Sequence, residues 1–243
     1  MSKPGADQLR AMLGRNHELA EKTVRPDFPL AHFETLQSWQ LERLTVTFKD
    51  LYEQEGYRHA VEFFVSDLYG GLDFRQRDQE MSRVMPIMIR FLPDKALVAL
   101  AEAFELQAIS LEYDFIMAEY MAVQGIRELD LEAYCDVYRA CSERAGRERQ
   151  IQLFPKIGRD LNKLVRKSIV NYLLRMLRGP AHAAGFGKLQ EFLETGLASF
   201  RALEDADYFV DTIYQREWGA MERLFARNPD PFRLPENRSR SAR

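Results

Sequence analysis

The sequence predicts an all-α protein, built as a single-domain bundle of about seven or eight helices. Apolar residues recur with the period of a helix nearly everywhere, and no segment alternates between apolar and polar residues as a strand would. Proline, glycine and capping residues divide the chain into pieces of helix length. The 243 residues contain no internal linker, so we predict a helical domain over residues 1–227 and a disordered tail over residues 228–243.

Breaks between the first helices come from residues with known local preferences. Pro26 and Pro29 interrupt the chain after the first helix. Gly70 and Gly71 end the third helix, because glycine readily takes the left-handed conformation that follows a helix. Asp73 is placed to cap the fourth, which can kink at Pro86 before Pro93 opens the fifth. The expected helices are about Asp7–Lys22, Leu30–Gln54, Tyr57–Tyr69, Asp73–Phe91 and Asp94–Val123.

In the second half of the chain, Asp130 is the expected N-cap of a further helix. This helix either continues through Gly146 and Pro155 or divides there. The helical pattern ends at Gly179, and two more helices are expected at about Gly187–Leu203 and Asp205–Arg227. The tail after them is rich in proline and arginine.

The fifth helix carries the clearest packing signal. Large and small apolar residues alternate along it at spacings of four and three, which is a heptad seam. We therefore expect this helix to pack against a neighbour along its whole length. The seam residues are Leu97, Ala101, Phe104, Ala108, Leu111, Phe115, Ala118 and Ala122.

Cysteine usage and the absence of apolar segments predict a cytoplasmic protein. Cys135 and Cys141 lie six residues apart on different faces of one helix, so we expect small free thiols rather than a disulfide. The first twelve residues lack the apolar core of a secretory signal. No window approaches the ~18 apolar residues that a membrane span needs.

Charge is segregated along the chain. Residues 94–136 contain ten acidic and two basic side chains, whereas residues 144–178 contain ten basic and two acidic ones. Within the basic segment four cations form a stripe that faces away from the apolar seam, and a fifth lies next to it, so we expect this group to be exposed rather than paired with the acidic residues. We call this group the basic face. Its residues, the predicted binding site, are Lys156, Arg159, Lys163, Arg166 and Lys167.

No catalytic or metal-binding pattern is recognised. Glu105, Glu112 and Glu119 recur every seven residues beside the seam, but the Glu-x-x-His pairs of a di-metal centre are absent. We interpret them as solvated or ion-paired residues. The four histidines, at positions 17, 32, 59 and 182, form no ligand pair, although a single histidine can bind haem in a helical fold. We predict no catalytic residue, no metal and no cofactor.

The densest local motif reads FFVSDLYGGLDFRQRD, from Phe63 to Asp78. It predicts a helix, a glycine turn and a capped second helix, with Val61, Phe64, Val65 and Leu68 buried. Asp67 and Arg77 are placed to meet across the turn. We interpret the motif as a structural corner formed by Phe63, Phe64, Asp67, Leu68, Tyr69, Gly70, Asp73, Arg77 and Asp78.

At this corner the sequence resembles a bacterial family named for its FFLEELY motif. The resemblance extends through MIRFLPDKALVALAEAFEL, RERQIQ, LVRKSIVNYLLRMLRGP and LQEFLETGLASFRAL, over about residues 51–225. Val65, Ser66 and Asp67 stand where the named motif has Leu, Glu and Glu. The resemblance implies a bacterial, cytosolic, helical protein and assigns no activity or residue roles.

Two functions from different classes follow from these patterns. The first is a non-enzymatic interaction or regulatory module that docks an anionic protein partner on the basic face, in preference to nucleic acid or a membrane surface. The second is a protein or enzyme that binds a small molecule or tetrapyrrole in a haem-oxygenase-like helical pocket, because the chain holds sixteen Phe and ten Tyr residues. A homo-oligomer built on helix faces is a third alternative.

Overall fold

The computed structural model describes residues 3–68, 85–86, 88–90, 92–167, 172 and 187–234. These residues form ten helical elements, eight of which have seven or more residues, and none of them lies in a strand. The prediction of an all-α, single-domain bundle is confirmed.

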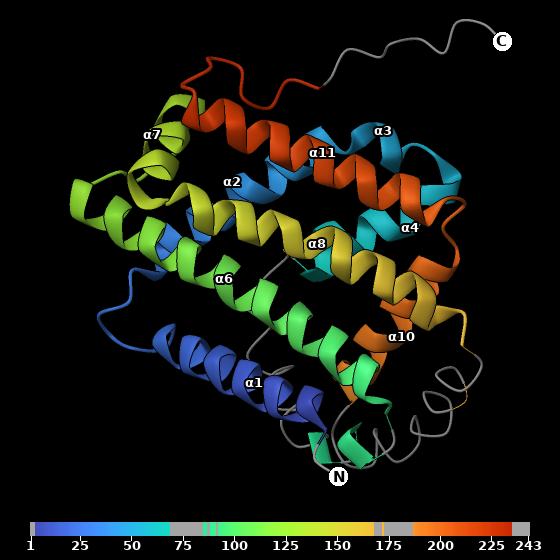
Figure 1. Cartoon of the computed structure of the whole chain (residues 1–243). Coiled ribbons are helices and arrows are strands. Elements are labelled where there is room, and N and C mark those ends of the chain that lie inside the picture. The colour runs from blue at the N-terminus through green and yellow to red at the C-terminus, as the bar shows by residue number, and fades with distance from the viewer. Residues whose placement is uncertain are drawn as a thin grey trace, which may run out of the picture.

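The helices follow one another with short connections in most of the described chain, and Figure 1 labels them in chain order. The elements are α1 (Pro4–Lys22), α2 (Leu30–Thr47), α3 (Lys49–Tyr52), α4 (Glu55–Glu62), the π-helix η1 (Phe63–Leu68), α6 (Asp94–Gln124), α7 (Leu131–Cys141), α8 (Arg144–Val165), α10 (Gly187–Arg201) and α11 (Ala206–Phe225).

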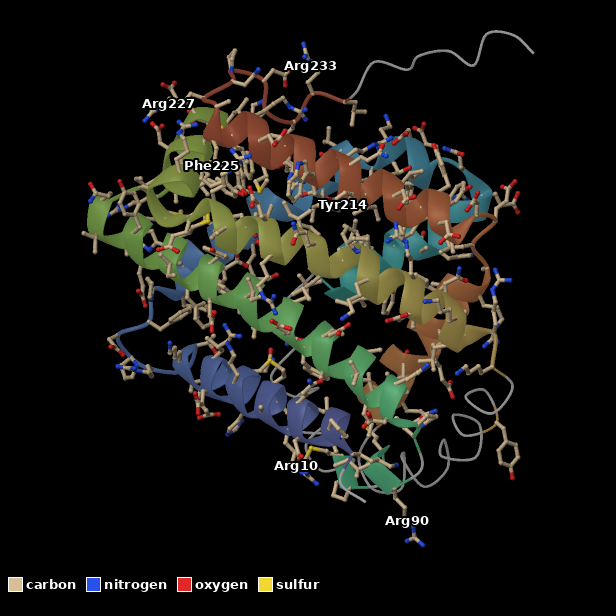
Figure 2. The ribbon with its side chains drawn as sticks, in the orientation of Figure 1. Arg10, Arg90, Tyr214, Phe225, Arg227 and Arg233 are labelled. Atoms are coloured by element: carbon tan, nitrogen blue, oxygen red, sulfur yellow. The ribbon has the colours of Figure 1, made fainter. Side chains whose placement is uncertain are left out.

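Four helices, α1, α6, α8 and α11, lie one beside the next across the bundle (Figure 1). Behind them α2 packs against α6, and α4 packs against α10. The short helix α7 closes one end through contacts with α6 and α11. Charged side chains such as Arg10 and Arg233 project outward from opposite sides of the bundle (Figure 2).

The heptad seam of α6 is buried as the sequence predicts. Its first seven residues, from Leu97 to Ala118, are at most 6% exposed, and Ala122 is half-buried. The N-terminal part of the seam packs on Leu9 and Leu13 of α1, while Phe115 meets the ring of Phe33 from α2. Each large apolar side chain buried here contributes about 1.5–3 kcal/mol.

The helix expected over Leu30–Gln54 is interrupted at Phe48. This residue has φ −110° and ψ 15°, which separates α2 from α3. Its ring is 1% exposed and packs edge-on against Phe64 of η1, at 5.9 Å between ring centroids. The helix break at Phe48 therefore coincides with burial of its aromatic side chain, and the spacing of apolar residues in the sequence does not indicate it.

The helix that begins after Asp130 ends at a place that the sequence does not indicate. Asp130 caps α7 by accepting a hydrogen bond from the backbone N–H of Ala133 at 2.8 Å. The chain then becomes extended at Ser142, and α8 starts at Arg144. Pro155 lies inside α8, so the division falls at Ser142 rather than at Gly146 or Pro155.

The first residues of the expected tail pack against the bundle. The Arg223 guanidinium donates hydrogen bonds to the carbonyl oxygens of Pro231 and Arg233, at 2.7 and 3.0 Å. The ring of Phe232 lies 5.9 Å from that of Trp39 in α2 and 6.1 Å from that of Tyr134 in α7. Residues 235–243 lie outside the described part of the chain.

Both cysteines are free thiols, as predicted: Cys135 is buried and Cys141 is half-buried. Among the described residues, no helix combines the length and the apolar character needed to cross a membrane.

Candidate functional site

The basic face is exposed, but it is partly ion-paired. All five of its side chains are solvent-exposed. Lys156 nevertheless pairs with Glu102 of α6, so the expectation that these cations avoid the acidic residues is wrong at this position. Arg159 pairs with Asp211 of α11 at 2.7 Å. The two side chains can meet because α8 packs against α11.

The C-terminal part of the basic face has only local contacts within the described chain. Lys163 pairs with Asp160 of its own helix at 3.0 Å, and Arg166 donates to Asn162 at 3.3 Å. The Lys163 side chain is 74% exposed. Cations near a helix C-terminus also interact favourably with the helix dipole, which gives these residues a structural role without any partner.

Only the beginning of the FFVSDLYGG corner lies within the described residues. Phe63 and Phe64 are 6% and 4% exposed in η1, a π-helix, and Phe64 packs edge-on against Phe154 of α8 at 5.3 Å. π-Helical turns frequently occur near functional sites. The expected contact between Asp67 and Arg77 lies outside the described part of the chain. So do the side chains of Asp67 and Leu68 and all atoms of Tyr69, Gly70, Asp73, Arg77 and Asp78.

The acidic row of α6 behaves as solvated or ion-paired residues. Glu105 pairs with Arg149 of α8, and Glu112 accepts from Arg15 Nε of α1 at 2.7 Å. Glu119 is exposed. Within the described ranges, no three histidine, cysteine or acidic side chains cluster closely enough to hold a metal ion.

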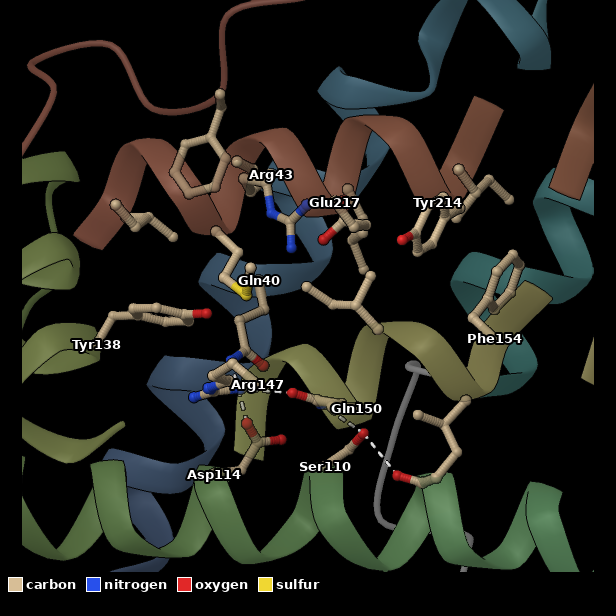
Figure 3. A pocket seen from close by; sticks show the side chains of 18 of the residues that line it. Gln40, Arg43, Ser110, Asp114, Tyr138, Arg147, Gln150, Phe154, Tyr214 and Glu217 are labelled. Atoms are coloured by element: carbon tan, nitrogen blue, oxygen red, sulfur yellow. Dashed lines mark hydrogen bonds and ion pairs between the residues drawn. The ribbon is translucent and has the colours of Figure 1, made fainter. Parts of the chain in front are cut away.

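The structure adds a site that the sequence analysis does not predict. A partly enclosed cavity of about 90 Å³ lies between α2, α6, α8 and α11, with α7 at one side (Figure 3). Apolar side chains from α2, η1, α6, α8 and α11 line it together with polar side chains from α2, α6, α7, α8 and α11. The polar lining residues are Gln40, Arg43, Ser110, Asp114, Tyr134, Tyr138, Arg147, Gln150, Tyr214 and Glu217.

Arg147 is a charged residue of the cavity lining. It is 6% exposed, and its guanidinium carbon lies 3.9 Å from the ring centroid of Tyr113 and 4.4 Å from that of Tyr138. The close approach of Tyr113 requires a glycine at position 146, where a Cβ atom would lie 1.9 Å from the phenol oxygen. Stacking between two aromatic rings stabilises a cation that burial would otherwise destabilise.

The hydrogen bonds of Arg147 are made to neutral groups. Nε donates to Ser142 Oγ at 2.9 Å, Nη1 to Gln150 Oε1 at 3.0 Å, and Nη2 to the Met117 sulfur at 3.3 Å. No carboxylate of the described chain lies within ion-pair distance of this guanidinium. A buried cation of this kind is uncommon, because buried charges are normally paired with an opposite charge.

Asp114 of α6 lines the cavity on the same side as Arg147 (Figure 3). Burial raises the pKa of its carboxyl to about 6, and hydrogen bonds from Gln40 and Gln37 together with the charge of Arg147 oppose this increase only in part. Gln40 Nε2 donates to Asp114 Oδ1 at 3.1 Å. The side chain therefore changes its charge close to neutral pH.

Three phenol groups complete the polar lining. Tyr134 and Tyr138 are 3% and 5% exposed, and burial raises the pKa of both, so their hydroxyl groups stay protonated. Neither these hydroxyls nor that of Tyr214 hydrogen-bonds to any residue that the structure describes. Figure 3 shows the Tyr138 oxygen pointing into the cavity. Buried phenols usually have a partner, so these oxygens are available to a bound molecule or to water.

A family model described as a domain of unknown function (DUF8198) matches residues 22–231 of the chain. The chain belongs to this family. The match includes all the lining residues of the cavity except Phe232. Neither the curated proteins nor the solved structures contain a match to the chain. Its resemblance to the FFLEELY-motif family stays a prediction.

Within the DUF8198 segment, a second helical stripe could have indicated the cavity. This stripe runs parallel to the heptad seam, with spacings of four, three and four residues. Its members are Ser110, Asp114, Met117 and Met121. Such a stripe predicts a second buried face of α6, and two of its members are polar. Arg147 carries no comparable signal, because it lies in a segment where basic residues are abundant.

Proposed function

We propose that this protein binds a small polar molecule in the cavity between α2, α6, α7, α8 and α11. The observation that carries the proposal is the convergence of the buried Arg147 guanidinium and the hydroxyls of two buried tyrosines, Tyr134 and Tyr138, on one cavity, with hydrogen-bonding capacity that the described chain does not use. A bound molecule or an ordered water in the cavity can form hydrogen bonds with these groups.

The size of the cavity limits the ligand. Pockets for drug-sized ligands have volumes of roughly 300–1,000 Å³, whereas this cavity measures about 90 Å³. None of its described lining residues is a histidine. The proposal therefore concerns a molecule of a few non-hydrogen atoms and does not extend to a tetrapyrrole.

Filling the cavity tests this proposal. Ala220 of α11 is 5% exposed and lines the cavity, so Ala220→Leu should occupy the space that a ligand needs. The full chain would be titrated with formate, formamide, acetate and methanol, and dissociation constants measured by NMR. We expect wild type to bind at least one probe at one site, and Ala220→Leu to bind it at least about tenfold more weakly.

The matched control is Ala206→Leu, which enlarges another buried alanine of α11 outside the cavity lining. It should bind the probe as wild type does, and circular dichroism should show equal helix content in both variants. The proposal fails if no probe binds, or if Ala220→Leu binds as tightly as wild type.

A second candidate function is docking of an acidic protein partner on the exposed end of α8. It is favoured by the grouping of Lys163, Arg166 and Lys167, which are exposed and form no ion pair with another described helix. Three adjacent cations produce a positive potential that steers an acidic surface and weakens as salt is added.

Charge reversal tests the docking candidate. The double variant Lys163→Glu, Arg166→Glu should lose binding to a poly-glutamate peptide at low salt, whereas Arg10→Glu, Lys22→Glu on α1 should retain it. Equal binding by both double variants would contradict docking at this place. Preferential binding of single-stranded DNA or phosphatidylserine vesicles would also contradict it, because those probes represent other partner classes.

A further inference from the structure

The Arg147 guanidinium has N–H donors that the described chain does not use. Arginine carries five N–H groups, two on each terminal nitrogen and one on Nε. Nε, Nη1 and Nη2 each donate one hydrogen bond, to Ser142, Gln150 and Met117. One N–H on each terminal nitrogen thus has no acceptor among the described residues. A guanidinium with two free N–H donors has the capacity to bind both oxygens of a carboxylate.

The surroundings hold this guanidinium in place. Tyr113 and Tyr138 cover it at 3.9 and 4.4 Å, and the Ser142 contact lies at the break between α7 and α8. A side chain that is already fixed loses little conformational entropy when a ligand binds. The hydroxyl of Tyr138, which points into the cavity, supplies a further donor beside it (Figure 3).

We infer that the cavity binds a small carboxylate, which accepts hydrogen bonds from Arg147 and the Tyr138 hydroxyl and competes electrostatically with Asp114. This inference rests on the proposed function and specifies the ligand of that site. The cavity volume of about 90 Å³ suits an acid of the size of formate or acetate.

Among the charged groups that line the cavity, Arg147 is the one that we expect to bind an anion. Arg43 of α2 pairs with Glu217 of α11, so these two charges largely cancel. Asp114 is the remaining anion and reduces the positive potential at Arg147 when it is ionised. Protonation of Asp114 removes this competition, so a carboxylate ligand should bind together with a proton. Arg147 and Tyr134 interact electrostatically with Asp114. The other titratable and charged groups that line the cavity with it are Arg43, Tyr138, Tyr214 and Glu217.

The experiment compares formate with formamide, its neutral isostere, by NMR titration of the full chain. For wild type we expect formate to bind at least about tenfold more tightly than formamide at pH 5.5. Between pH 7.5 and pH 5.5, where formate stays ionised, its affinity should increase about tenfold as Asp114 takes up a proton. Formamide should show no such dependence.

Variants assign the effect to residues. Asp114→Asn should bind formate more tightly than wild type at pH 7.5 and lose the pH dependence. Tyr138→Phe and Arg147→Gln should weaken formate binding, the second by at least about tenfold. Arg149→Gln, an exposed arginine on the same helix, is the control and should leave binding unchanged. If Arg147→Gln does not fold, Asp114→Asn and Tyr138→Phe still test the inference.

The outcomes separate this inference from the proposed function. Equal binding of formate and formamide, or a pH dependence that persists in Asp114→Asn, overturns the carboxylate inference and leaves a site for small polar molecules. Failure of both probes and of all the other small probes overturns the proposed function as well.

Discussion

At the scale of single residues, the most unusual feature is the pair Arg147 and Asp114. Both face one cavity, yet they do not form an ion pair within the described chain. Arg147 is stabilised by two aromatic rings and by neutral acceptors, whereas Asp114 is held by the amide of Gln40. A direct contact between them would neutralise both charges, so their separation keeps each available to a third group.

The raised pKa of Asp114 predicts that the free energy of unfolding depends on pH. Burial raises the pKa of its carboxyl from 3.8 to about 6 in the folded protein. A carboxyl with a raised pKa contributes stability that is fully present below about pH 4 and is lost as the pH rises through about 6. The asparagine in Asp114→Asn does not ionise, so the variant does not lose this stability. The free energy of unfolding of the variant minus that of wild type should therefore increase by about 2–3 kcal/mol from pH 4 to pH 8.

Urea unfolding at the two pH values measures this change. Glu119→Gln, which removes an exposed carboxylate from the same helix, is the matched control. Its difference from wild type should be the same at pH 4 and pH 8. A flat difference for Asp114→Asn would show that the carboxyl is solvated in the folded protein.

At the scale of helices, close backbone contacts decide where small residues are required. The N-terminus of α1 lies against the start of α6, where the Gly5 N–H donates to Asp94 Oδ1 at 2.9 Å. A Cβ atom on Gly5 would lie 2.8 Å from the carbonyl oxygen of Asp94 and 2.9 Å from the backbone nitrogen of Val98. These are backbone atoms, which cannot move aside without separating the two helices.

Two glycines of α1 should therefore respond oppositely to the same substitution. Gly5→Ala should lower the free energy of unfolding by about 1–3 kcal/mol, because two helices must move apart. Gly14→Ala should raise it by about 0.5–1 kcal/mol, because a Cβ atom there meets nothing within 4 Å and alanine favours helix. Thermal and urea unfolding of both variants measure the effect. If Gly5→Ala is as stable as wild type, α1 does not approach α6 this closely.

At the scale of the whole molecule, the bundle brings distant parts of the chain to one place. Trp39 of α2 stacks on Tyr134 of α7 at 3.8 Å between ring centroids, and Phe232 covers both from beyond α11. The guanidinium of Arg43 lies 5.1 Å from the Phe232 ring and pairs with Glu217. The polar cavity beneath these groups thus combines side chains from positions 40 to 232.

Local features of the sequence are enough to predict the helical class and the principal packing face. The seam from Leu97 to Ala118 is buried as predicted, and Asp130 caps α7, because helix period and capping are local properties of the chain. The exposure of the basic face was also predictable, since it follows from the position of its residues around one helix.

Which side chains meet depends on how the helices pack. Lys156 pairs with Glu102, the chain breaks at Phe48 and Ser142, and Arg147, Asp114 and Tyr138 converge on one cavity. Each of these depends on contacts between helices that are far apart in sequence, and local periodicity contains no information about such contacts. The candidate site is therefore a property of the packed bundle, whereas the bundle class is a property of the sequence pattern.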